Sequence, residues 1–114
     1  MSTNVNAKTI VVLEGDDTGQ ELLEESLRVL SADVIGFALE FPRFDLSLQS
    51  RRESQNAVVH EAARSIRENG FGLKAATITP EGRDDVGSPN RILREEIGGR
   101  VIVRTGRRIP GVIP

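Results

Sequence analysis

The sequence predicts an α/β fold with three layers, in which a mostly parallel sheet has helices packed on it. A β-branched run at residues 9–13 is typical of a strand that is buried on both faces. Leucines recur at helical spacing over residues 22–30, and a second apolar stripe of helical period covers residues 57–66. Strand-like and helix-like segments therefore alternate along the chain, which indicates a parallel sheet covered by helices.

The first strand leads into an acidic, glycine-containing turn at residues 14–19. Thr18 and Glu21 have the spacing of a capping box, so we expect their side chains to satisfy free amides where the first helix begins. Residues 37–41 predict a second strand, and we expect Pro42 to end it.

The middle of the chain begins with residues 45–55, which are polar and without a clear period, so we expect a loop there. The apolar stripe that follows predicts a helix ending at Asn69 and Gly70, a favoured C-terminal cap. Residues 71–76 predict a short buried strand, and a loop rich in Gly, Asp and Pro continues to Gly87.

The last quarter contains one further helix. Ser88 supplies a hydroxyl N-cap, Pro89 takes the first helical position, and Gly98 and Gly99 are expected to stop the helix. Residues 100–104 predict a final strand, whereas two prolines keep the apolar tail at residues 109–114 from regular structure.

Composition limits the class of protein. The length of 114 residues suits a single domain over residues 1–114 and is too short for two domains with a cleft between them. No window approaches the roughly 18 apolar residues that cross a bilayer, and residues 1–7 predict a frayed terminus instead of a signal peptide. Cysteine is absent, which excludes disulfides and thiolate chemistry. We therefore expect a cytoplasmic protein with no membrane partner.

The net charge of −2 conceals an uneven distribution. The last quarter prefers anions, because only Glu95 and Glu96 oppose its six arginines, which are Arg91, Arg94, Arg100, Arg104, Arg107 and Arg108. Guanidinium groups suit the bidentate recognition of carboxylate or phosphate. Nucleic acid is not an expected partner, since the chain has no Trp or Tyr to stack on bases.

Three segments, in order, resemble motifs of the isocitrate and isopropylmalate dehydrogenases, the β-decarboxylating dehydrogenase family. Residues 13–21 resemble the family's Gly-Asp-Gly-Ile-Gly-Pro-Glu loop, and residues 72–80 its Leu-Lys-Gly-Pro-x-x-Thr-Pro segment. Residues 88–94 match Ser-x-Asn-x-x-Leu-Arg and lead to residues 101–104, which are similar to Ala-Asn-Val-Arg. The resemblance runs from Lys8 to Val112 and implies a truncated form of the family's fold, its N-terminal third.

The sequence also departs from these motifs. Asp17 replaces a glycine of the first motif, Ala75 and Ala76 replace Gly-Pro in the second, and Thr105 and Gly106 follow the last arginine where the family usually has proline.

The resemblance implies that Ser88, Asn90, Arg94 and Arg104 bind the carboxylates of a substrate. It implies more weakly that Thr79 lines the cofactor pocket and that Lys74 belongs to the same cleft wall. Spacing alone also puts Asn90 and Arg94 on one helix face, near a helix start that favours an anion. The alternative is that Ser88 only caps the helix, Asn90 is solvated and the arginines pair with acids such as Glu95 and Glu96, while Thr79 belongs to an ordinary turn.

No metal site is expected. The acidic pairs at Asp16-Asp17 and Asp84-Asp85 lie in predicted turns, where adjacent side chains usually point apart. His60 has no second histidine or cysteine to join it, so we expect a surface histidine on a helix.

In the family, the catalytic tyrosine, the catalytic lysine and the metal-binding aspartates would follow beyond residue 114. We therefore expect no catalytic residue here and an isolated chain that is inactive, with NAD(P) and Mg or Mn bound only if a partner completes the site. The first hypothesis is a non-catalytic or split member of the family that keeps part of a hydroxy-acid carboxylate site and acts as a subunit or binding module. The second is an interaction or assembly module without a small-molecule ligand, either a homo-oligomer or bound to a larger partner chain, and the third is an excised fragment.

Overall fold

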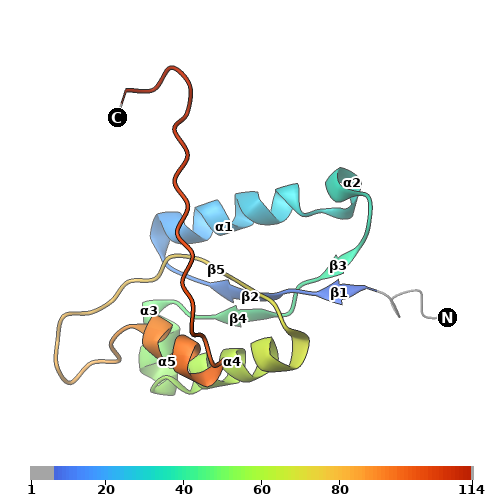
Figure 1. Cartoon of the computed structure of the whole chain (residues 1–114). Coiled ribbons are helices and arrows are strands. Elements are labelled where there is room, and N and C mark those ends of the chain that lie inside the picture. Colours follow the sequence, from blue (N-terminus) through green and yellow to red (C-terminus); the bar gives the residue numbers. More distant parts are fainter. Residues whose placement is uncertain (1–6, 114) are drawn as a thin grey trace.

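The computed structural model describes residues 7–113 and confirms the α/β class (Figure 1). Nearly all of the predicted frayed terminus, residues 1–7, lies outside the described residues. A parallel sheet separates the helix α1 (Asp17–Val29) on one face from the helices α3 (Leu48–Ser54), α4 (Ala57–Asn69) and α5 (Pro89–Glu96) on the other. A short helix, α2 (Ala32–Ile35), follows α1. Among the described residues, no helix is both long and apolar enough to cross a membrane.

The central strand of the sheet is β2 (Val11–Glu14). It lies between β4 (Arg43–Asp45) and β5 (Gly72–Lys74), and both neighbours run parallel to it. Just before these strands, β1 (Lys8–Thr9) pairs in parallel with β3 (Leu39–Glu40). The predicted strands at residues 9–13 and 71–76 are thus present, although β5 is only partly buried.

The second strand, predicted at residues 37–41, is present over two residues as β3 and ends before Pro42, but strand pairing resumes with β2 from Arg43. Proline has no N–H, so it removes one donor and interrupts the ladder between β3 and β4. Its carbonyl still accepts a hydrogen bond from the Val12 N–H at 2.8 Å. The two short pairings therefore continue one another across the proline.

Alternating side chains of β2 enter two separate cores. Val11 and Leu13 pack with Val59 and Leu93 from α4 and α5, while Val12 packs on the opposite face against Leu23 of α1 and others. This two-sided burial explains the continuous β-branched run, since each such side chain contributes about 1.5–3 kcal/mol when it is fully buried.

The prediction of a loop at residues 45–55 is wrong, because α3 occupies most of this stretch. Ser47 caps it by accepting a hydrogen bond from the Ser50 N–H at 3.3 Å. The sequence has no apolar stripe here because the side chain that α3 buries completely is that of Arg51. A pattern search for apolar residues cannot find such a helix.

The capping box predicted at Thr18 and Glu21 is also wrong. The N-cap of α1 is Asp16, so Thr18 already lies in the first turn. Gln20 takes over part of the role, because its Oε1 accepts a hydrogen bond from the Gly15 N–H at 2.9 Å. Asp17, which stands where the family motif has glycine, adopts a left-handed backbone with φ of 46°.

The two later helices begin and end as predicted. Gly70 caps α4 with φ of 91°, and its N–H donates to the Ile66 carbonyl at 2.7 Å. Ser88 caps α5, with Pro89 in the first helical position, and the Gly99 N–H donates to the Arg94 carbonyl at 2.9 Å beyond its end.

The final strand predicted at residues 100–104 is wrong. Residues 100–113 have no strand structure and are all exposed, with Val101 at 81% and Val103 at 79%. In Figure 1 the tail leaves the end of α5, crosses the sheet and α1 in this view, and ends beyond them. A β-branched run forms a strand only where a neighbouring strand accepts and donates its backbone hydrogen bonds.

Candidate functional site

A cavity of about 280 Å³ lies where α5 packs beside β5. Leu13 and Gly72 come from the sheet, and Ile66 comes from α4. Helix α5 and the residue after it complete the wall with Asn90, Leu93, Arg94 and Ile97, and Lys74 at the end of β5 closes the set. Most of these residues are apolar, and the polar ones are two cations and one amide.

Lys74 is the more buried of the two cations, since it is half-buried and Arg94 is exposed. Its Nζ donates hydrogen bonds to the Ala75 carbonyl at 2.8 Å and to the Thr77 Oγ1 at 3.1 Å. Burial lowers the pKa of the Lys74 ammonium below its usual range, the guanidinium groups of Arg51 and Arg94 lower it further, and Asp16 opposes them. The described residues that line the cavity include no carboxylate, so a bound anion would relieve the repulsion between Lys74 and Arg94.

Arg94 is not paired with the acids that follow it in the sequence. Among the described residues, Glu95 pairs with Arg91 at 3.1 Å, and Glu96 with His60 at 2.5 Å and Arg67 at 3.9 Å. The alternative that the glutamates neutralise Arg94 is therefore not what the structure has.

The structure brings together three of the six residues that the resemblance implied, Lys74, Asn90 and Arg94. Ser88 instead lines a neighbouring depression of about 410 Å³, and its Oγ accepts from the Asn90 N–H at 3.3 Å. Thr79 is exposed on the loop that joins β5 to α5, and Arg104 is exposed in the tail.

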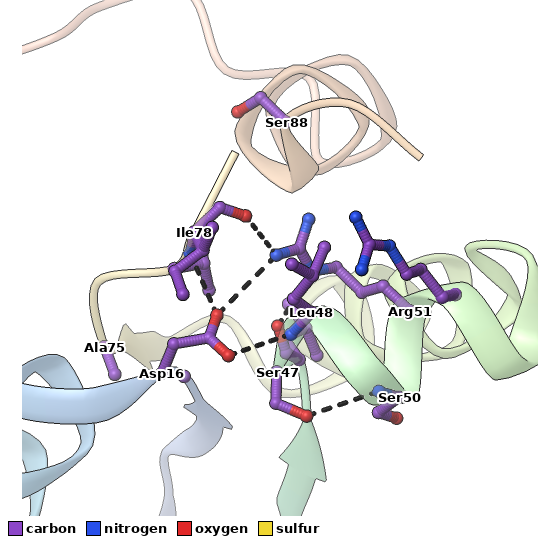
Figure 2. Close-up of polar contacts among 12 residues, drawn as sticks. Asp16, Ser47, Leu48, Ser50, Arg51, Ala75, Ile78 and Ser88 are labelled. Carbon is purple, nitrogen blue, oxygen red and sulfur yellow. Dashed lines mark hydrogen bonds and ion pairs between the residues drawn. The ribbon is translucent and has the colours of Figure 1, made fainter. Parts of the chain in front are cut away.

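Sequence reasoning missed a polar cluster, formed by the fully buried Arg51 and the mostly buried Asp16, that contacts this loop (Figure 2). Asp16 does not cap its own helix through its side chain. Its Oδ1 accepts from the Leu48 N–H at the start of α3, and its Oδ2 accepts from the Ile78 N–H, both at 2.9 Å. One carboxylate thus joins the end of β2 to α3 and to the loop.

Arg51 is fully buried and donates to three carbonyl oxygens. Its Nε donates to Leu46 at 2.9 Å, its Nη1 to Gly87 at 3.0 Å, and its Nη2 to Ile78. The Nη2 also lies 3.7 Å from the Asp16 Oδ2. Burial lowers the pKa of Arg51, and the charges of Asp16 and Asp85 oppose this shift. No sequence signal distinguishes this arginine from an exposed one.

Two other possible metal ligands, Asp85 and His60, have partners within the structure. Asp85 accepts two hydrogen bonds from Arg52, at 2.6 and 3.1 Å, and these lower its pKa. His60 is half-exposed on α4 and contacts Glu96 of α5 through its Nδ1. The described residues contain no group of three His, Asp or Glu side chains that could hold a metal ion.

The glycines of the first turn allow it to approach the end of β5 closely. A side chain at Gly15 would collide with the Ala76 carbonyl, and a Cβ at Gly19 would lie 2.6 Å from the same oxygen. The turn is therefore a packing device here, and the Asp16 N–H donates to that carbonyl at 3.1 Å.

Comparison with known proteins agrees with the motif order. The sequence model of the isocitrate/isopropylmalate dehydrogenase family matches residues 9–111. The chain belongs to this family. The mitochondrial NADP isocitrate dehydrogenase of Saccharomyces cerevisiae is 32% identical over 113 residues, which cover 92% of this chain and 25% of the enzyme. That of Aspergillus niger is 33% identical, with coverages of 92% and 21%.

A bacterial relative has a similar match. The NADP isocitrate dehydrogenase of Sphingobium yanoikuyae is 31% identical over 116 residues, covering 92% of this chain and 28% of the enzyme. This member of the dehydrogenase family thus spans about a quarter of the length of the curated relatives it matches.

Proposed function

We propose that the chain supplies a carboxylate-binding wall of an isocitrate-type substrate site, as a non-catalytic part of a larger or split dehydrogenase. The observation that carries this proposal is the cavity beside β5, which Lys74, Arg94 and Asn90 line together with apolar residues, and which has no carboxylate among its described lining residues. Two cations and an amide donor suit a small, multiply charged hydroxy acid. The relatives suggest the substrate class, since each of the three is named as an isocitrate dehydrogenase.

We include Ser88 and Arg104 in the proposed site, but each would contact a ligand only under its own condition. Ser88 lies beside the cavity at the start of α5, so it would act on a ligand that extends past Asn90. Arg104 is in the exposed tail and would take part only if the tail folds over the ligand.

Oxidation and decarboxylation need a nicotinamide and a Lewis acid. The described residues do not fit these groups by themselves, because Thr79 is exposed and no three possible ligands for a metal ion lie together. We therefore infer that NAD(P) and Mg or Mn bind only where a partner chain or a further segment completes the site, and that the isolated chain is inactive. The cytoplasm is the proposed location, in keeping with a chain that has no cysteine.

The test is a thermal-unfolding and calorimetric titration of the chain with isocitrate, citrate and isopropylmalate. Binding to the folded state raises stability by about 2.7 kcal/mol at a ligand concentration of 100 times Kd. Arg94→Ala should abolish the rise. Arg28→Ala is the matched control, because Arg28 lies on α1, across the sheet from the cavity, and pairs with Glu25 in an exposed position. A rise that is absent from the wild type, or equal in both variants, would contradict the carboxylate site.

A second candidate is an interaction module that binds no small molecule. It is favoured by the exposed apolar tail, where Val101, Ile102 and Val103 cover no core, and by the outer edge of β5, which pairs only with β2 among the described strands. Sedimentation would detect a homo-oligomer or a larger assembly. Val101→Asp should then weaken association, whereas Thr105→Asp adds the same charge at a polar position of the tail and should have little effect.

A further inference from the structure

Residues 75–88 join β5 to α5 without helix or strand, apart from turns. Loops of this length are uncommon inside a compact domain unless they have a function, and an untethered one would leave its two ends independent. Here the ends matter, because Lys74 precedes the loop and Asn90 and Arg94 follow it. The shape of the cavity therefore depends on the contacts that hold both ends of the loop, in addition to the pairing of β5 with β2 and the packing of α5 on α4.

Arg51 contacts both ends. Its Nη2 donates to the carbonyl of Ile78 near the start of the loop, and its Nη1 donates to the carbonyl of Gly87 immediately before Ser88. Its Nε donates to the carbonyl of Leu46, which fixes the guanidinium to the segment between β4 and α3. Figure 2 shows the cluster together with Ser88 at the start of α5.

Asp16 also holds the start of the loop, at the residue that Arg51 contacts. Its carboxylate accepts the Ile78 N–H, so this one residue of the loop is held through both its N–H and its carbonyl. Two contacts hold the later part of the loop, since the Asn56 Nδ2 donates to the Val86 carbonyl at 3.0 Å and Arg52 pairs with Asp85. Only Arg51 joins the two ends to each other among the described contacts.

We propose that Arg51 is a positioning residue for the substrate cavity, which sets the place of Asn90 and Arg94 relative to Lys74 by clamping both ends of the loop. This inference rests on the proposed function. Arginine is required because its planar fork directs donors toward three separate carbonyls, whereas a lysine ammonium is a single flexible point charge. The guanidinium is fully buried and does not line the cavity, so it acts through the loop and not on the ligand.

The experiment compares isocitrate binding by Arg51→Lys, Arg52→Lys and Val59→Ala with that of the wild type, at a temperature where each is folded. Arg52 is the neighbouring, exposed arginine, which holds the same loop through Asp85. Val59 is a fully buried core residue of α4, so Val59→Ala lowers stability at a position outside the loop. Calorimetry measures Kd, and ¹H–¹⁵N spectra report the amides of Asn90 and Arg94. We expect Arg51→Lys to weaken isocitrate binding by about tenfold or more, because a lysine loses at least one charge-assisted hydrogen bond to the loop carbonyls. We also expect the signals of both amides to shift.

The two control variants should bind isocitrate within about twofold of the wild type. If Arg51 only stabilises the fold, Arg51→Lys will behave as Val59→Ala does, with a lower melting temperature but unchanged Kd and amide signals, and the proposal is overturned. If the wild type does not bind isocitrate, the proposed function fails. The positioning role is then decided by the amide signals and by hydrogen exchange of residues 76–88, which must change in Arg51→Lys and not in Val59→Ala.

Asp16→Asn keeps the inference testable if Arg51→Lys does not fold. An amide accepts through one atom only, so it can hold either the Leu48 or the Ile78 N–H but not both. We expect weaker isocitrate binding and faster exchange of the loop amides. Unchanged values for both would overturn the proposal.

Discussion

On one face of the sheet, α4 and α5 pack over a core of seven buried residues that includes Val11, Leu13 and Leu93. On the other face, α1 covers a smaller core of three, Val12, Leu23 and Ala75. Helix α1 also leaves large apolar side chains in solvent, with Leu22 69% and Val29 61% exposed. The cavity lined by Lys74 and Arg94 is on the side of the larger core, where packing and the contacts of Arg51 hold its walls.

The difference shows that the two helical layers are attached in different ways. Helices α4 and α5 are held by buried apolar area and by the contacts of Arg51 and His60. Helix α1 depends more on its first turn, where Gly15 and Gly19 lie against Ala76. We therefore expect substitutions on the two faces to have unequal effects.

The largest effect should come from paired truncations of leucines on the two faces. Leu13→Ala empties a position in the larger core, and Leu23→Ala makes the same change in the smaller one. We expect losses in the free energy of unfolding of about 4 and about 2.5 kcal/mol respectively, since the cost of a cavity rises when its surroundings cannot collapse. Urea denaturation measures both. Equal losses would mean that the two faces stabilise the fold alike.

A smaller effect should follow from adding one methyl group to the turn that holds α1. In Gly19→Ala the new Cβ would lie 2.6 Å from the Ala76 carbonyl, so α1 must move away from β5. We expect a loss of about 2 kcal/mol and faster hydrogen exchange in α1 than in α4. Gly106→Ala, where no atom lies within 4 Å, is the control. Uniformly faster exchange in both helices would show that α1 is not a separate unit.

The elements that could be predicted from the sequence are those set by local chemistry. Ser88 with Pro89, and Gly70, act on backbone groups only a few residues away, so their motifs determine where α5 begins and α4 ends. Asn90 and Arg94 share a face because of helix geometry alone, and they do meet in the cavity.

The elements that could not be predicted depend on distant partners. Helix α3 has no apolar period because it buries Arg51, whose acceptors Ile78 and Gly87 lie far along the chain. Residues 100–104 have strand composition but no neighbouring strand among the described residues. The cap at Thr18 failed because the N-cap is Asp16, whose carboxylate binds the distant N–H groups of Leu48 and Ile78. Composition carries no information about which of these partners are present.

A substitution at Asp17 should strengthen the attachment of α1, which covers the smaller core. The Asp17 φ of 46° is a left-handed conformation that costs an L-residue about 1–2 kcal/mol, less for Asp than for most. Asp17→Gly removes that strain but also a negative charge at the start of α1, worth about 0.3–1 kcal/mol. We expect a net gain of about 0.5 kcal/mol in the free energy of unfolding, measured by thermal and urea denaturation. Asp17→Ala, which keeps a Cβ and loses the charge, should instead destabilise the fold.

The smallest effect on stability should come from Lys74, which lies on the side of the larger core. Burial and the nearby Arg51 and Arg94 lower its pKa in the folded state, so the unfolded chain binds more protons between that pKa and the ordinary value of 10.5. The free energy of unfolding should therefore rise with pH through this window, because the penalty for burying the ammonium disappears as it loses its proton. Lys74→Met should remove this rise, whereas Lys8→Met, at an exposed position of β1, should keep it. Urea midpoints measured from pH 7 up to 10.5 give the comparison. If the wild type and Lys74→Met have parallel pH profiles, the buried ammonium costs the fold nothing. The cavity would then not be an environment that a bound anion improves.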